Sequence, residues 1–303
     1  LSPFPASSER TEWARTQARF LRSFGDRVPF EIVNDDLLYE IPFEVINDKV
    51  VIQARLNGGE PFPLVVDSGA EQTVLSQETA ERYGVRSITS TVSAGVGEVG
   101  LRNIDIGRAD SLQFGTLEVR NVPVLIKNPP LTGLPSTRVP DGLSPLALGM
   151  SAIIDYRRQR LVLARTLPEE PADIVIPMWV ERLAVISGVV NGQHTRSFVV
   201  DTGGEVISIG LGTARSIDVP EVRNIPLKVF GTSGWDDDAY LLPGVDLNFN
   251  TVSYENYPVV VLNLHRPSVL LGFQLGGILG HTFLRNYVVS MDISRSELRL
   301  KRF

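Results

Sequence analysis

Two short stretches of the sequence each place an ionisable side chain directly after a run of apolar residues. Asp67 follows such a run in "LVVDSGAEQT", and Asp201 follows one in "FVVDTGGEVI". Burial of a lone carboxylate is costly, so one such Asp would be interpreted as a turn former or a helix cap. Two in equivalent positions can share one proton, because like charges in contact do not both ionise easily. One carboxyl is then an acid and the other a base, which suits hydrolysis by an activated water without a metal or a covalent intermediate.

The residues after each Asp suit a tight turn. Gly69 and Gly203 allow backbone N–H groups to approach the carboxylates. Ser68 and Thr202 supply hydroxyls that we expect to hydrogen-bond between two lobes and to support the Asp pair. Ordinary turn chemistry is the alternative for these two hydroxyls.

An internal repeat relates the two Asp residues, which are 134 positions apart. The tripeptides "LNG" and "VNG" precede them at equal distances. Downstream, "LQFGTLEVRNVPVL" from Leu112 matches "LNFNTVSYENYPVV" from Leu247 at an offset of 135. Since landmarks in the same order at a nearly constant offset indicate a repeat, we predict three parts: an N-terminal extension of residues 1–38, a first lobe of 39–168 and a second lobe of 169–303.

Each lobe has the pattern of an all-β structure. Short runs of Val, Ile and Leu alternate with Gly, Asn and Asp, and long helical periodicity is missing from both lobes. The 26 glycines and 20 prolines suit tight hairpins. We therefore predict two small β-barrels.

The N-terminal extension differs, because its apolar residues recur at helical spacing. Trp13, Phe20, Leu21 and Phe24 fall on one helical face. We expect a helix that begins at Ser7 or Ser8, ends at Gly25 and packs this face on the lobes. A remnant propeptide, or a docking element for a membrane or a partner, is the alternative, since the other face carries arginines.

The composition narrows the function further. The chain has 303 residues, 43% of them hydrophobic, a net charge of -6 and no cysteine. This balance is typical of a soluble globular protein, and the acidic charge argues against nucleic acid as the partner. No run of 18 apolar residues is present, so we expect no transmembrane span. Three histidines and no cysteine argue against a metal site, and we expect no metal and no cofactor.

The two Asp motifs resemble those of a known family. "DSGAEQTVLS" and "DTGGEVISIG" resemble the D-T/S-G motifs of aspartic peptidases. The surroundings look most like the bacterial retropepsin-like group with both lobes in one chain. The resemblance covers both lobes and implies retropepsin/pepsin-like β-barrel lobes related by a pseudo-two-fold axis, with Asp67 and Asp201 as the catalytic pair.

In that family, two apolar residues and a glycine support each active-site turn. Ile278, Leu279 and Gly280 match this pattern in the second lobe. In the first lobe, the spacing to Asp155 predicts Gly142 as the equivalent of Gly280, and we expect this support to be degraded or rearranged.

The family also covers its cleft with flexible hairpins, the flaps. Two glycine-rich stretches, "VSAGVGEVG" and "VFGTSGWDDD", lie at similar distances after the two Asp residues. We predict two flaps, with Trp235 lining the cleft, and two ordinary hairpin turns are the alternative. The predicted flap residues are Gly95, Val96, Gly97, Gly231, Gly234 and Trp235.

The leading functional hypothesis is an aspartic endopeptidase that binds an extended peptide and needs only one chain to form its site. The first alternative is a catalytically silent peptide-binding protein that keeps the cleft, a reading that the altered first-lobe support and the acidic residues 236–238 favour. The second is a peptidase kept latent by its N-terminal helix, or one that needs a partner.

The family pattern also bears on pH and location. Pepsin-like enzymes often carry a hydroxyl residue after D-T-G, whereas this chain has Ala70 and Gly204 there. Because a missing donor stabilises the carboxylate less, we predict an optimum less acidic than that of pepsin-like enzymes. The chain begins at Leu1 rather than Met, and a free peptidase is hazardous in the cytoplasm, so we expect a periplasmic or secreted protein.

Overall fold

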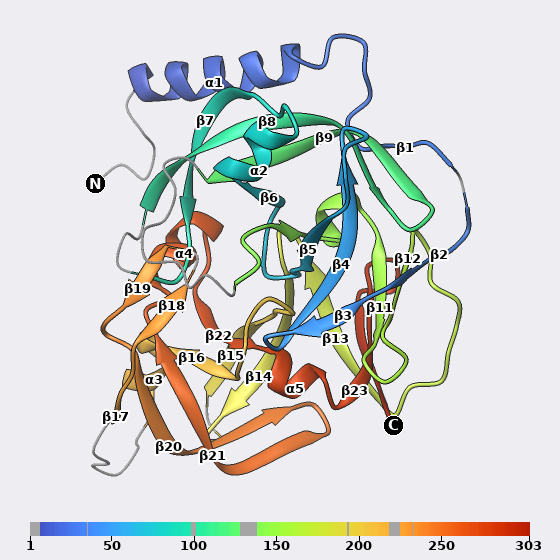
Figure 1. Ribbon diagram of the computed structural model, residues 1–303. Coiled ribbons are helices and arrows are strands. Elements are labelled where there is room, and N and C mark those ends of the chain that lie inside the picture. Colours follow the sequence, from blue (N-terminus) through green and yellow to red (C-terminus); the bar gives the residue numbers. More distant parts are fainter. Residues whose placement is uncertain are drawn as a thin grey trace.

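The computed structural model describes residues 7–34, 36–97, 101–127, 138–192, 194–217, 225–231 and 233–303, without the side chains of residues 7–13, 194 and 195. Two β-rich lobes flank a central sheet, and a helix lies at the outer edge of the first lobe (Figure 1). This confirms the predicted all-β class with an N-terminal helix.

The first lobe is one curved sheet of nine strands, in which β3 pairs with β4 and the others follow the order β1-β9-β6-β10-β5-β4-β8-β7. In β4, Val50, Ile52, Ala54 and Leu56 are buried on one face; on the other face Gln53 and Arg55 are exposed, while Val51 is also buried. The strands are β1 (Glu31–Ile32), β3 (Glu44–Ile46), β4 (Lys49–Leu56), β5 (Phe62–Val66), β6 (Thr73–Ser76), β7 (Ser87–Ala94), β8 (Leu101–Phe114), β9 (Leu117–Lys127) and β10 (Gly142–Leu143). Two short helices accompany them, α2 (Gln77–Arg82) and the 3-10 helix η1 (Leu146–Leu148).

The second lobe pairs its strands in a corresponding way, with β15 parallel to β22 as β5 is parallel to β10. Its strands are β14 (Ala184–Val190), β15 (His194–Val200), β16 (Ser208–Gly210), β17 (Ile225–Pro226), β20 (Tyr240–Phe249), β21 (Val252–Leu262) and β22 (Leu275–Leu279). β18 (Val229–Gly231) and β19 (Gly234–Asp236) form a separate hairpin. The helices are α3 (Leu211–Ser216), α4 (His265–Leu271) and α5 (His281–Leu284).

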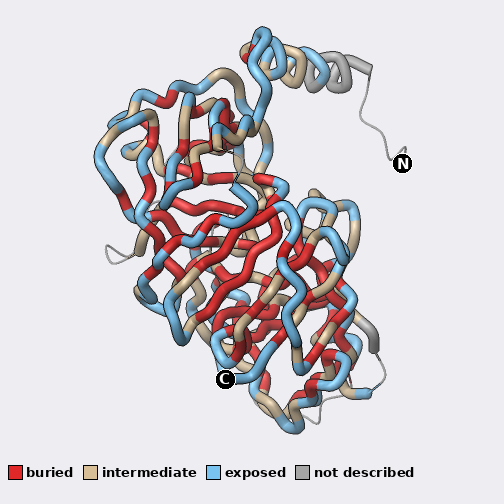
Figure 2. Tube along the Cα trace, turned by 90° about the vertical axis from the view of Figure 1, so that its right-hand side faces the viewer, coloured by how far each residue is buried: buried red, intermediate tan, exposed pale blue. Residues whose placement is uncertain are grey.

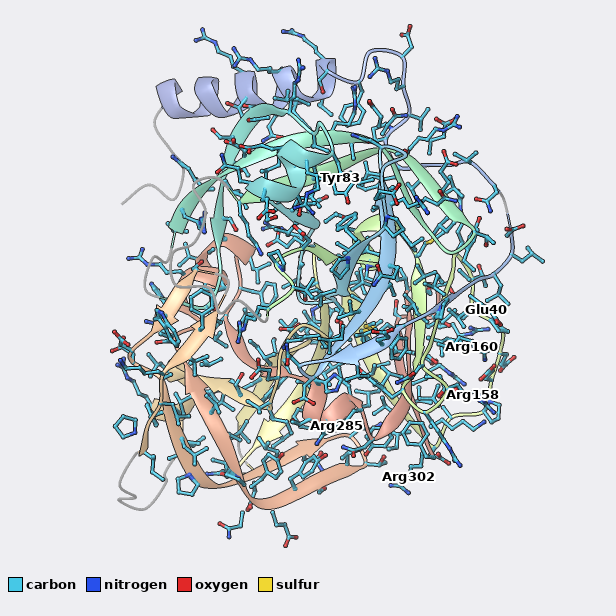
Figure 3. The ribbon with its side chains drawn as sticks, viewed as in Figure 1. Glu40, Tyr83, Arg158, Arg160, Arg285 and Arg302 are labelled. Atoms are coloured by element: carbon cyan, nitrogen blue, oxygen red, sulfur yellow. The ribbon has the colours of Figure 1, made fainter. Side chains whose placement is uncertain are left out.

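A central antiparallel sheet joins the two halves of the chain in the order β13-β24-β23-β11-β12-β2. Three of its strands come from each half: β2 (Tyr39–Pro42), β11 (Ser151–Asp155) and β12 (Arg160–Ala164), then β13 (Ile174–Val180), β23 (Tyr287–Asp292) and β24 (Glu297–Arg302). At its edge Arg160 donates to Glu40 at 2.9 Å (Figure 3). Buried strands run continuously through this region (Figure 2), so the lobes share one hydrophobic core.

The N-terminal helix α1 (Ser7–Arg22) ends in a turn in which Gly25 has a φ of 58°. Phe24 is buried and packs edge-on against Phe20, and the Arg108 guanidinium lies 5.7 Å from the Phe24 ring centre. Leu21 is 64% exposed, so its predicted packing on the lobes is wrong. The predicted packing of Trp13 concerns a side chain outside the described residues. The helix lies beside β7 on the outer side of the first lobe and stands out from the body (Figures 1 and 2).

Among the described residues, no helix is both long and apolar enough to cross a membrane.

Candidate active site

The side chains of Asp67 and Asp201 leave the ends of two equivalent strands, β5 and β15. Each strand ends in a fully buried valine, so the chain passes from the core directly into the turn. A parallel strand supports each turn: the Asp67 N–H donates to the Leu143 carbonyl in β10 at 2.8 Å, and the Asp201 N–H donates to Leu279 in β22 at 3.1 Å. The same local arrangement therefore presents both carboxyls.

Reciprocal hydrogen bonds lock the two turns together. Ser68 Oγ donates to the Val200 carbonyl at 2.7 Å and accepts the Thr202 N–H at 3.0 Å. Thr202 Oγ1 donates to the Val66 carbonyl at 2.7 Å and accepts the Ser68 N–H at 3.0 Å. Both side chains are fully buried, where losing a partner would leave an unsatisfied polar group. The expected hydrogen bonds between the lobes are present.

The two glycines of the turns allow the close approach of the lobes. A Cβ on Gly69 would overlap the carboxyl of Asp201, and a Cβ on Gly203 would overlap the carboxyl of Asp67. Each glycine therefore makes room for the Asp of the opposite lobe. No other residue type fits at either position without displacing a carboxyl.

The two carboxyls accept different numbers of hydrogen bonds from backbone N–H groups. Asp201 Oδ1 accepts the N–H groups of Gly203 and Gly204, both at 2.8 Å. Within the described residues, Asp67 accepts one backbone N–H, that of Gly69 at 3.0 Å. Because N–H donors stabilise the anion, this arrangement favours negative charge on Asp201.

The surroundings of Asp67 change the pKa of its carboxyl. Burial, then the negative charge of Asp201 and hydrogen bonding with its carboxyl, raises the pKa of Asp67 to about 7, and the Gly69 N–H and the Lys49 ammonium act in the opposite direction. Asp67 therefore keeps its proton over a pH range in which an ordinary Asp loses it.

The first-lobe support lies two residues away from its predicted position. Gly142 pairs with Val65 and Val74 as Ile278 pairs with the equivalent residues of the second lobe. Leu143 is thus equivalent to Leu279, and buried Ser144 occupies the position of Gly280. The prediction that Gly142 is equivalent to Gly280 is wrong, because the connection to the central sheet is one residue shorter in the first lobe. The support strand itself is intact.

The predicted flap residues lie at the tips of two hairpins that meet. The tip between β7 and β8 includes Val96, whose carbonyl accepts the N–H of Ser233 in the β18–β19 hairpin at 2.9 Å. A Cβ on Gly97 or Gly231 would overlap the opposite tip. Trp235 is 39% exposed and packs edge-on against a phenylalanine ring. Residues 98–100 and 232 of the two predicted stretches lie outside the described residues, and the flap motion stays a prediction.

Each active-site turn also carries a glutamate that pairs with an arginine of the other half. Arg182 Nε donates to Glu71 at 2.7 Å, and Arg138 Nη2 donates to Glu205 at 3.2 Å. Arg138 Nη1 also donates to the Phe230 carbonyl in β18 at 3.0 Å. These four charged residues were not predicted from the sequence, although a Glu stands four positions after each Asp.

The two features that favoured a silent binding protein have structural explanations. The support strand of the first lobe is present, with Ser144 in the place of a glycine. Asp236 is buried and accepts the N–H groups of Asp238 and Asn263 at 3.1 and 3.0 Å, so it stabilises the loop beside β19. Neither feature argues against catalysis.

Metal ligands do not gather around the Asp pair in the part of the chain described above, where no group of three or more His, Asp or Glu side chains could hold an ion.

Comparisons with known proteins agree with this geometry. Residues 52–152, which include Asp67 and the support strand, match the family model for aspartyl protease. The fold is similar to the crystal structure of aspartic proteinase from Irpex lacteus, with a TM-score of 0.51 over 88% of this chain and 97% of that one, at 13% sequence identity. A search of curated proteins gives no match.

The first lobe, which matches the family model, contains the turn with Asp67, and the fold places the turn with Asp201 next to it. The first lobe is thus similar to the aspartyl protease family, the chain has a fold similar to that of an aspartic proteinase, and the two findings together support a peptide hydrolase.

Proposed function

We propose that the chain is an endopeptidase in which Asp67 and Asp201 share one proton and activate a water. The observation that carries this proposal is the close approach of the two lobes at the dyad: each carboxyl lies against the turn glycine of the opposite lobe, and the two turns are locked to each other by hydrogen bonds. The unequal backbone donors suggest their roles. Asp201, with two N–H donors, is the base, and Asp67 is the acid.

The reaction follows from this charge distribution. Asp201 takes a proton from water while the water oxygen bonds to the peptide carbonyl carbon, and Asp67 gives its proton to the carbonyl oxygen. The resulting neutral diol loses a hydroxyl proton to Asp67 as the C–N bond breaks. The departing nitrogen takes the proton held by Asp201. The products are a carboxylic acid and an amine, and the dyad returns to its starting state.

The substrate in this proposal is an extended peptide below the two flaps. Their strands pair with the peptide backbone by strand addition. Val96 and Ser233 already bond to each other between the tips, so both hairpins must open for a peptide to enter. Because both carboxyls belong to one chain, a monomer is sufficient.

The proposed roles set the pH range. Activity needs the proton on Asp67, so it should decline as the pH rises through about 7, the pKa of that carboxyl. We therefore expect maximal cleavage at mildly acidic pH, above the range of pepsin-like enzymes. Peak activity below about pH 4, the ordinary range of an Asp, would contradict the proposal.

The direct experiment is a peptide-library cleavage assay with the wild type, Asp67→Asn and Asp201→Asn. Each replacement keeps the shape of the side chain and removes its ability to exchange a proton. Both variants should lose cleavage by at least about a thousandfold, as expected when an acid or base is removed from a concerted site. Full activity in either variant would exclude the shared dyad, and tight peptide binding by the wild type without turnover would support a silent binding protein.

A further inference from the structure

A lysine from the first lobe lies against the active-site turn of the second. Lys49 begins β4, and its Nζ donates to the carbonyl of Gly203 at 2.5 Å. Its side chain is only 17% exposed and also lies 3.7 Å from Glu205. Since Gly203 is the residue that contacts the carboxyl of Asp67, the ammonium supports the backbone that closes over the dyad.

The hairpin that carries Lys49 has a tight turn and contacts the second lobe. Asn47 and Asp48 connect β3 and β4 with φ values of 50° and 56°, as in the tight two-residue turns that match the twist of a hairpin. Asp48 accepts a hydrogen bond at 3.2 Å from Arg285, which lies beside α5 and is labelled in Figure 3. The hairpin of the first lobe is thus docked on the second lobe on both sides of its turn.

The second half has no lysine at the position equivalent to Lys49. In the pairing of β4 with β5, Lys49 has the position that Leu183 has before β14 in the second half. Leu183 is buried and apolar, so it offers neither a charge nor a donor to the other turn. Lys49 therefore breaks the pseudo-symmetry of the site.

We propose that Lys49 is a positioning residue of the dyad: its ammonium holds the Gly203 turn against Asp67 and lowers the upper limit of the pH range in which the site works. This inference rests on the proposed peptidase function. A positive charge beside a carboxyl that must stay protonated favours loss of the proton. Lys49 therefore counteracts burial and keeps Asp67 acidic enough to give up its proton during the reaction.

Other charged groups in the neighbourhood must be considered in any interpretation of pH. Around Lys49 these are Glu205, Asp48, Arg285 and the buried His281, whose pKa is lowered by burial and, to a smaller degree, by cations that include Lys49. Around Asp67 they are Asp201 and, from β9, Lys127. All of these stay in place when only residue 49 is changed.

The test compares Lys49→Met, which removes the charge and the donor, with Lys49→Arg, which keeps the charge. Lys301→Met, at an exposed position in β24, is the matched control. For each protein, kcat and KM are measured from about pH 4 to pH 9, and the Asp67 carboxyl is titrated by ¹³C NMR with Asp67→Asn for assignment.

In Lys49→Met we expect kcat to fall about tenfold, as for a small displacement of a catalytic group. The pH at which activity declines on the alkaline side should rise by roughly half a pH unit, and so should the midpoint of the Asp67 titration. Lys49→Arg should restore the pH limb, and Lys301→Met should match the wild type.

The inference is overturned if the wild type is active and Lys49→Met shows the same decline of activity at alkaline pH and the same Asp67 titration as the wild type. If the wild type cleaves no peptide but the NMR titration moves as expected, the peptidase proposal fails while the influence of Lys49 on the dyad stands.

Discussion

Asp67→Asn should stabilise the folded protein at neutral pH while it abolishes cleavage. In the wild type, raising the pH through about 7 removes the last proton from two carboxyls in contact. An asparagine carries no charge at any pH, and its amide can donate to Asp201 as a protonated Asp67 would. The variant therefore avoids the repulsion that the wild type meets as the pH rises.

The magnitude follows from proton linkage. The pKa of Asp67 rises from 3.8 to about 7 on folding, so the folded state binds this proton more tightly than the unfolded state does. The associated stability is present below pH 3.8 and is lost as the pH rises to about 7. Three units of pKa correspond to about 4 kcal/mol. Relative to Asp67→Asn, the wild type should lose about this much unfolding free energy between roughly pH 4 and pH 8.

Urea unfolding of both proteins at several pH values measures the difference, with tryptophan fluorescence as the signal. Asp237→Asn, which removes an exposed carboxylate outside the dyad, is the matched control. Parallel curves of stability against pH for the wild type and Asp67→Asn would refute the reasoning, because they would show that folding does not change how tightly Asp67 holds its proton.

Three further changes test other parts of the structure. Thr202→Val should lower the unfolding free energy by about 2–3 kcal/mol, since it leaves buried partners unsatisfied, while Thr202→Ser should restore it; denaturant unfolding decides. Gly203→Ala should lower kcat/KM by about a hundredfold or more, because its Cβ displaces the Asp67 carboxyl, with an unchanged circular dichroism spectrum. Phe24→Ala should speed hydrogen exchange in α1 without changing cleavage, because the helix lies on the outer side of the first lobe; a gain in cleavage would instead support latency.

The Asp pair could be predicted from the sequence because its chemistry leaves local signals. Each motif combines an apolar strand, a carboxyl and a glycine within a few residues, and the repeat shows that there are two. The roles of Ser68 and Thr202 follow from the same symmetry. Nothing outside the two motifs is needed to infer these contacts.

Features that depend on loop length or on distant contacts could not be predicted in this way. The equivalence of Gly142 with Gly280 is wrong because counting back from Asp155 assumes that the support strand and the central sheet are joined by equally long segments in both lobes. In the first lobe η1 stands in the place of α5. Lys49 contacts a turn 154 residues away, and no local pattern marks such a contact. Leu21 fits the helical period, but α1 is too peripheral for its whole apolar face to be covered.

The position of β24 in the central sheet has a consequence for folding. This strand, Glu297–Arg302, lies between β13 and β23, and β23 pairs with β11 of the first half. The sheet that joins the two halves therefore closes only when strands from widely separated parts of the chain have met. Since contacts between residues so distant in sequence form slowly, we expect the joining of the two halves to be a late step in folding.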